Sequence, residues 1–220
     1  ADGRVAVPGF YDNVRPLDDA ERTALAQVPY GAAEILDESG APALWGEARY
    51  TPVERTGARP TLEINGMWGG YIGDGFKTVI PSQAHAKISC RLVPDQDPER
   101  IGALVEAHLR SLAPPTVTVD VTPHHQGHPF LTALDAPAMQ VAAAAYEQVF
   151  GRAPVYTREG GGIPVTVTFQ QALDSPVVLR GFGLPDDNLH APNEKFDLRM
   201  LEHGMRTVAS FYDIWGARGS

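Results

Sequence analysis

The chain has 220 residues, of which 43% are hydrophobic and 20% are charged, and its formal net charge is −9 at pH 7. This composition is typical of a globular protein with one large domain or two small ones, and the acidic balance argues against a nucleic-acid partner because like charges repel. No apolar run has the length that spans a membrane, and the single cysteine, Cys90, excludes an internal disulfide.

The first 60 residues are irregular and contain two predicted short helices. Asp18 caps a predicted helix over Asp19–Gln27, because its carboxylate can accept hydrogen bonds from the first free backbone amides. A second predicted helix, Ala32–Glu38, is expected to end at Gly40, since glycine readily adopts the left-handed conformation that terminates helices.

The next predicted elements are strands. Thr61–Asn65 alternates in polarity, and Asn65-Gly66 at its end is a typical turn signal. A glycine-rich loop follows, and Lys77–Ile80 is predicted as a short extended segment. Ala84–Leu92 alternates over its whole length, with small and apolar side chains on one face and polar side chains on the other, which predicts a strand.

A helix and a further strand complete the first half of the chain. Asp97 and Pro98 are a suitable cap and first residue for a helix, and apolar residues recur at helical spacing as far as Leu112. Thr116–Thr122 alternates again and predicts a strand. This order of elements indicates an antiparallel sheet that is covered on one face by helices.

The second half has the pattern of an α/β domain and follows a polar linker, Pro123–Leu134. Ala136–Phe150 and Ile163–Leu173 are predicted helices, the first ended by Gly151. Val177–Leu179 is a short apolar run typical of a buried parallel strand. The last predicted helix has one apolar face, formed by Leu201, Met205, Val208, Tyr212 and Trp215.

The segment Gly70–Thr78 resembles a phosphate-binding loop but lacks two of its requirements. Phe76 separates the last glycine from Lys77, and Pro81 with the following strand pattern replaces the helix that presents backbone amides to a phosphate. We therefore interpret this segment as a flexible turn.

Two segments are candidates for ligand binding, and each has an ordinary alternative. Arg91, on the polar face of a predicted strand, suits bidentate binding of a carboxylate, although its position alone favours an ordinary surface arginine. Glu159–Gly162 places three glycines between a strand and a helix, where backbone can approach a ligand closely. A plain turn is the alternative for this second segment.

Histidines are the remaining candidates. His190 follows a strand-like run in the second half and is a candidate metal ligand or acid–base group, although by spacing alone it is one histidine of seven. His124, His125 and His128 form a cluster without a neighbouring carboxylate or thiolate, and we interpret that cluster as part of a solvated loop.

Four segments in a fixed order carry a resemblance to a known family. They read GDGFKTVIP, AHAKISCRLVPDQDP, TREGGGIPVTVTFQ and GFGLPDDNLHAPNEKF. Together they resemble the dinuclear-zinc metallopeptidases that include carnosine-type dipeptidases, acetylornithine deacetylase, succinyl-diaminopimelate desuccinylase and glutamate carboxypeptidase. The resemblance extends from about residue 59 to about residue 215.

The resemblance implies an α+β lid, with a ferredoxin-like antiparallel sheet and two helices, followed by the C-terminal part of an α/β zinc-peptidase catalytic domain. The lid is expected over residues 1–125, incomplete at its N-terminus, and the catalytic portion over residues 126–220. The implied activity is hydrolysis of dipeptides or short peptides with two zinc ions. The implied protein is a cytoplasmic homodimer joined through its lids.

Residue by residue, the resemblance gives His190 as the last ligand of the dinuclear zinc site. Thr78 and Arg91 match lid residues that hold the backbone and the C-terminal carboxylate of the substrate. Gly162 stands where the family usually has serine, which removes one substrate hydrogen bond. The loop expected to line the substrate pocket consists of Glu159, Gly160, Gly161 and Gly162.

The remaining ligands and the general-base glutamate are expected upstream of Ala1, because residues 1–60 contain no His-x-Asp segment and no Glu-Glu pair of the family type. We therefore expect a C-terminal fragment that by itself neither hydrolyses peptides nor binds zinc tightly. Two alternatives stay open: a deacylase of N-acyl amino acids in the same family, and a non-catalytic lid-type module for dimerisation or peptide binding.

Overall fold

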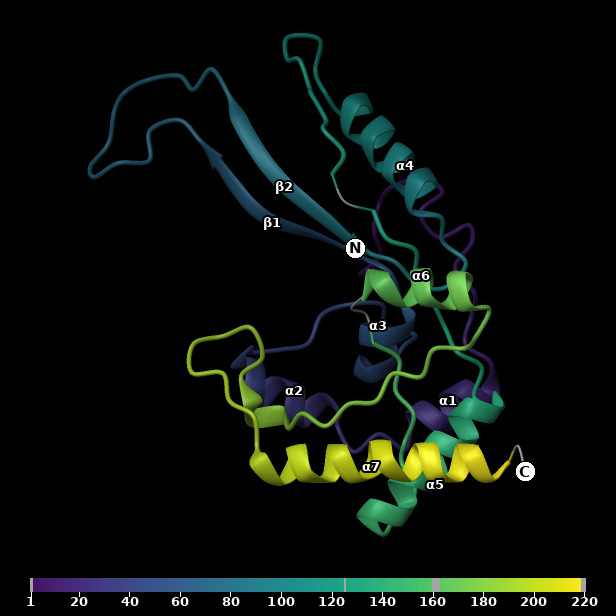
Figure 1. Cartoon of the computed structure of the whole chain (residues 1–220). Coiled ribbons are helices and arrows are strands. Elements are labelled where there is room, and N and C mark those ends of the chain that lie inside the picture. Colours follow the sequence, from purple (N-terminus) through teal and green to yellow (C-terminus); the bar gives the residue numbers. More distant parts are fainter. Residues whose placement is uncertain (1, 125, 160–162, 219–220) are drawn as a thin grey trace. The chain divides into compact units, whose positions relative to one another are not determined.

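The computed structural model describes residues 2–124, 126–159 and 163–218, and it divides into two compact units. Unit 1 comprises residues 1–130 and 157–164, and unit 2 comprises residues 131–156 and 165–220. The elements in chain order are α1 (Asp19–Leu25), α2 (Ala32–Ser39), α3 (Pro52–Ala58), β1 (Thr61–Gly69), β2 (Ala84–Arg91), α4 (Pro98–Ser111), α5 (Pro137–Phe150), α6 (Pro164–Leu173), the 3-10 turn η1 (Pro185–Asp187) and α7 (Leu198–Ala217) (Figure 1).

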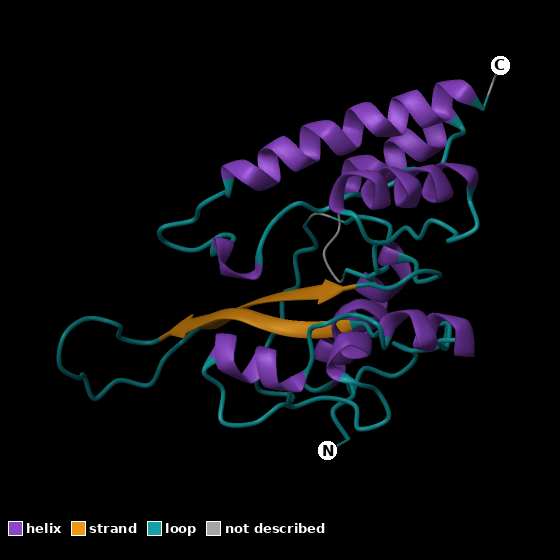
Figure 2. Cartoon of the chain, turned by 90° about the horizontal axis from the view of Figure 1, so that it is seen from below, coloured by secondary structure: helices purple, strands orange, loops and turns teal. Residues whose placement is uncertain are grey.

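Strands β1 and β2 of unit 1 form one antiparallel hairpin with a long connecting loop (Figure 2). The pairing runs from Thr61 opposite Arg91 to Gly69 opposite Ala84. The predicted turn at Asn65-Gly66 is wrong, because the ladder continues past it with only a shift in register. An extra residue in one strand of a pair is accommodated as a bulge, and the chain reverses later, in residues 70–83.

Local capping explains most helix boundaries. Asp18 accepts a hydrogen bond from the Glu21 amide at 2.8 Å, and the Glu21 carboxylate accepts one from the Asp18 amide at 3.1 Å. These reciprocal bonds satisfy free amides at the start of α1, which confirms the helix predicted there. Helix α3 was not predicted from the sequence, although Thr51 and Glu54 form the same kind of capping box at its start.

The main core of unit 1 joins the N-terminal segment to α4 and the root of the hairpin. Val7, Phe10 and Ile101 are buried together. Gln96, which is 3% exposed, fixes this arrangement, because its side-chain amide donates to the Phe10 carbonyl at 2.8 Å and its side-chain oxygen accepts from the Val93 amide at 3.0 Å. The root of the hairpin is therefore the better anchored end.

Two of the predicted strands do not pair with any strand among the described residues. Thr116–Thr122 and Val177–Leu179 belong to no strand, and Val117 and Leu179 are 55% and 49% exposed. A strand needs a partner edge for its backbone groups, and polarity patterns do not supply one. The only sheet in the described parts of the chain is the β1–β2 pair, so a four-stranded ferredoxin-like sheet is not seen.

In unit 2, α5 packs against α7. Val141 and Ala145 are buried on α5, and Gly204 and Thr207 are buried on α7. The predicted end of α5 at Gly151 is confirmed, with φ of 71°. The architecture is a mixed α/β fold, while the predicted boundary between a lid (1–125) and a catalytic portion (126–220) stays a prediction.

No helix in the described residues is both long enough and apolar enough to cross a membrane.

Candidate functional site

Thr78 and Arg91 lie on the same hairpin but in different parts of it. Thr78 is exposed in the loop between the strands, whereas Arg91 is the last residue of β2 and pairs with Thr61 at the hairpin root. The loop contains internal contacts, since Tyr71 donates to the Asp74 carbonyl at 2.9 Å and the Lys77 ammonium lies 4.6 Å from the Tyr71 ring centroid. The element that follows Lys77 is strand β2 and not a helix, as the sequence predicted.

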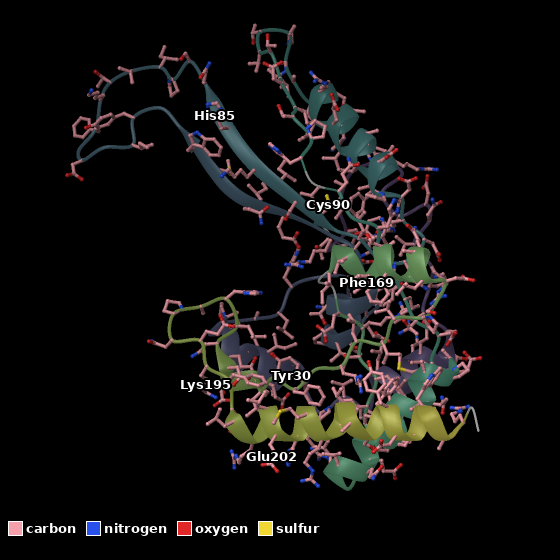
Figure 3. All side chains as sticks on the ribbon, in the orientation of Figure 1. Tyr30, His85, Cys90, Phe169, Lys195 and Glu202 are labelled. Atoms are coloured by element: carbon pink, nitrogen blue, oxygen red, sulfur yellow. The ribbon has the colours of Figure 1, made fainter. Side chains whose placement is uncertain are left out.

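Cys90 lies on the opposite face of β2 from Arg91, near the root of the hairpin (Figure 3). Its side chain is half-buried against the core of unit 1. Burial, with a smaller contribution from the nearby Glu63 carboxylate, raises the pKa of the Cys90 thiol to about 11. The thiolate is therefore scarce at neutral pH, and Cys90 is unsuited to nucleophilic chemistry.

The segment that leads into the predicted pocket loop is anchored in unit 1. Glu159 is exposed, but the side chain of Arg158 before it is only 10% exposed and forms an ion pair with Glu21 of α1. A Cβ atom on Gly57 of α3 would lie 2.0 Å from the Arg158 carbonyl oxygen. Glycine at this position permits the close approach of the two backbones.

The three glycines that complete the predicted pocket loop, Gly160, Gly161 and Gly162, lie outside the described residues.

His190 lies in the loop between η1 and α7 of unit 2, with an exposed side chain and a φ of 61°. Its backbone amide donates to the Glu194 carboxylate at 3.3 Å. Within residues 163–218 and the other described ranges, its imidazole has no hydrogen-bond or ion-pair partner. Both ring nitrogens are consequently accessible, as one must be in a metal ligand.

The resemblance implies a zinc site, and the side chains described above show how many zinc ligands the chain offers. An exposed imidazole is a suitable zinc ligand, so His190 fits one position in a zinc site. However, the described residues contain no group of three or more His, Cys, Asp or Glu side chains that could hold a metal ion. His124 and His128 are exposed and belong to no such group. The described part of the chain therefore offers one suitable ligand and not a complete metal centre.

Unit 1 also contains a cavity of about 500 Å³. Its lining includes Arg4, Tyr11, Glu47, Tyr50 and Arg59, and none of the site residues predicted from the sequence. Arg59 forms a paired ion contact with Glu47 at 2.8 and 3.0 Å. Because the Glu47 carboxylate already pairs with the Arg59 guanidinium, whose side chain is only 9% exposed, we assign no catalytic role to the cavity.

Two residues that support the predicted site were not predicted from the sequence. Arg158 anchors the pocket loop, and Asp187, which is 1% exposed, holds the loop of His190. A buried carboxylate must have hydrogen-bond partners, but its burial is not visible in a loop sequence. Asp187 could have been found only from its position between Pro185 and Asn188 in a turn-forming segment.

The known proteins that resemble this chain in sequence and in structure belong to one class of enzymes, the metallopeptidases. The sequence pattern of peptidase family M20/M25/M40 matches residues 27–213. The Cys-Gly metallodipeptidase DUG1 of Saccharomyces cerevisiae is 32% identical over 221 residues, which is 97% of this chain and 45% of that protein.

Solved structures agree with the sequence match. Human carnosine dipeptidase 1 superimposes with a TM-score of 0.80 at 29% identity, over 96% of this chain and 45% of the other. The M20 family metallo-carboxypeptidase Sso-CP2 from Sulfolobus solfataricus gives a TM-score of 0.81 at 27% identity, over 95% and 48%. The fold is thus that of metallopeptidases.

The chain belongs to peptidase family M20/M25/M40. It spans about half the length of the curated relatives that it matches. The family resemblance that the four ordered segments indicated is therefore confirmed.

Proposed function

We propose that the chain is the C-terminal part of a zinc-dependent dipeptidase and contributes one metal ligand, His190, and a substrate-binding hairpin to it. The observation that carries this proposal is the exposed His190 imidazole, which has no partner among the described residues and lies within the part of the chain that the family pattern matches. Relatives named as Cys-Gly and Beta-Ala-His dipeptidases support a dipeptide substrate. Zinc bound at such a site acts as a Lewis acid and lowers the pKa of coordinated water.

The hairpin supplies the substrate contacts in this proposal. Arg91 binds the C-terminal carboxylate of the peptide, because a guanidinium forms paired hydrogen bonds with a carboxylate. Thr78 contacts the peptide backbone, and Glu159–Gly162 lines the pocket. These residues bind and orient the peptide, while the proton transfers belong to a glutamate outside residues 1–220.

The amount of exposed surface supports a larger protein. The chain exposes 15504 Å², whereas a compact protein of 23.7 kDa exposes about 10,000 Å², and two separate compact units together about 12,000 Å². A stripe along α7 contributes to the excess, with all its large side chains at least 39% exposed; its members are Leu198, Leu201, Met205, Val208, Tyr212 and Trp215.

Covering these apolar faces is the natural role of the remainder of a catalytic domain, because isolated apolar stripes of this length are unfavourable in water. Among the residues that the structure describes, no strand pairs with Val177–Leu179 of the same unit either. In this proposal the lid comprises residues 1–125, its sheet is completed by further strands, and two lids join the homodimer. The complete protein is cytoplasmic.

Two observations test the proposal. The reading frame upstream of Ala1 is expected to encode a His-x-Asp segment and a Glu-Glu pair, and the polypeptide that includes them is expected to hydrolyse Cys-Gly, while residues 1–220 alone do not. A reading frame without these ligands, or a longer polypeptide that cleaves N-acyl amino acids and no dipeptide, would contradict it.

A further inference from the structure

The loop that contains His190 has an unusual backbone. Asn188, His190 and Asn193 all have positive φ, at 54°, 61° and 62°. Residues with a Cβ atom adopt this left-handed conformation only rarely, although asparagine and histidine do so more often than most other residues. Such backbone persists only where surrounding contacts determine it.

Asp187 provides contacts to both ends of this loop. One of its carboxylate oxygens accepts from the Leu184 amide at 2.7 Å, and the other accepts from the Lys195 ammonium at 3.2 Å. Its backbone carbonyl accepts from the Lys195 amide at 3.0 Å. Residues on either side of His190 are therefore joined through a single side chain that is 1% exposed.

Lys195 lies at the end of the loop that leads into α7 (Figure 3), and its contacts with Asp187 hold that end in place. It also contacts the Asp186 carboxylate at 3.0 Å. Glu194, the residue before it, accepts the hydrogen bond from the His190 amide. Fixing Lys195 thus fixes the residue that holds the backbone of His190.

We infer that Asp187 and Lys195 form a clasp that positions His190, with Asp187 as the positioning residue. The clasp holds His190 at positive φ, and this backbone conformation sets the direction of its Cα–Cβ bond before any ligand binds. The role of His190 as a zinc ligand rests on the proposed function, whereas the clasp itself concerns only the chain. Preorganised ligands bind metal more tightly because less ordering remains to be done.

The test uses the 220-residue chain and nuclear magnetic resonance without metal. The one-bond Cα–Hα coupling of His190 reports on the sign of φ, and amide exchange reports on the two bonds of the clasp. Asp187→Ala is expected to move the coupling toward that of negative φ and to accelerate exchange of the Leu184 and Lys195 amides at least about tenfold. An unchanged coupling would overturn the inference.

Two control variants separate positioning from general stability. Asp186→Ala removes a neighbouring carboxylate, 74% exposed, that also contacts Lys195, and it is expected to leave the His190 coupling unchanged. Val141→Ala in α5 removes part of the core of unit 2, and it is expected to lower the melting temperature without changing the coupling. A shift of equal size in either control would contradict a specific role of Asp187.

The conservative variant Asp187→Asn covers the case in which Asp187→Ala unfolds unit 2. It keeps an oxygen for the Leu184 amide and loses the charge that holds Lys195, so a partial shift of the His190 coupling is expected; full retention would overturn the inference. Because none of these measurements involves zinc or peptide, a failure of the proposed dipeptidase function would leave their outcome intact.

Discussion

Arg158 forms an ion pair with Glu21, although the two residues are 137 positions apart in the chain. Their side chains are only 10% and 17% exposed, so removing one leaves the other charge poorly solvated. Arg158→Met is expected to lower the free energy of unfolding of unit 1 by about 2 kcal/mol. Chemical denaturation followed by the fluorescence of the tryptophans in unit 1 measures this loss.

Arg15→Met is the matched control, because Arg15 contacts the same Glu21 carboxylate at 2.9 Å but is 47% exposed. Exposed ion pairs contribute little, so a loss below about 1 kcal/mol is expected. Equal losses in the two variants would show that burial of Arg158 does not determine its contribution.

Gly57 is expected to tolerate no side chain. In Gly57→Ala the new Cβ atom would lie 2.0 Å from the Arg158 carbonyl oxygen, a backbone atom that cannot rotate away. The entrance to the pocket loop must then move, and a destabilisation above about 2 kcal/mol is expected. Thermal unfolding compares this variant with Gly216→Ala in α7, where nothing lies within 4 Å of the new atom. The control should be neutral or more stable by up to about 1 kcal/mol, since alanine favours helix; similar losses in both would contradict the account.

Cys90 is expected to react slowly with iodoacetamide at pH 8. Burial raises its pKa from 9.0 to about 11, so the folded state disfavours the thiolate. The corresponding stability is fully present below pH 9, decreases between pH 9 and 11 because the unfolded chain releases the proton first, and is lost above that range. Alkylation rates across this range, compared with those in denaturant, check the prediction. A folded chain alkylated at pH 8 as fast as the unfolded one would refute it.

The features predicted correctly from the sequence depend on neighbours in the chain. Asp18 caps α1, and Gly151 ends α5, because capping involves residues only a few positions apart. The polarity pattern of β2 was likewise sufficient to predict the strand, although only Ile88 and Cys90 of its apolar face are half-buried.

The features that were missed depend on distant partners. Thr116–Thr122 alternates as a strand does, yet no described strand pairs with it. The contact between Gly57 and Arg158 joins segments that are far apart in sequence. For the candidate site, sequence position made Arg91 and His190 candidates, but only the resemblance favoured them over ordinary surface residues and added Thr78. Asp187 had only a weak signal, its place in a turn-forming segment, because burial creates its importance.

Arg91 is expected to determine affinity for a free C-terminal carboxylate in the complete enzyme. Arg91→Ala should raise KM for a dipeptide about 10- to 100-fold, as expected for a lost charge-assisted hydrogen bond, and change KM for the corresponding C-terminal amide little. Steady-state kinetics with both substrates provide the comparison. Lys87→Ala, on the same face of β2, is the control and should affect neither. Equal effects of Arg91→Ala on acid and amide would contradict carboxylate binding.

The zinc content of the longer polypeptide after dialysis, compared between the unaltered protein and His190→Ala, tests whether His190 is a zinc ligand. We predict two zinc ions per chain, with loss of at least one in His190→Ala and no loss in His128→Ala, whose histidine also lies in an exposed loop. Full retention of zinc in His190→Ala would contradict the assignment of His190 as a ligand.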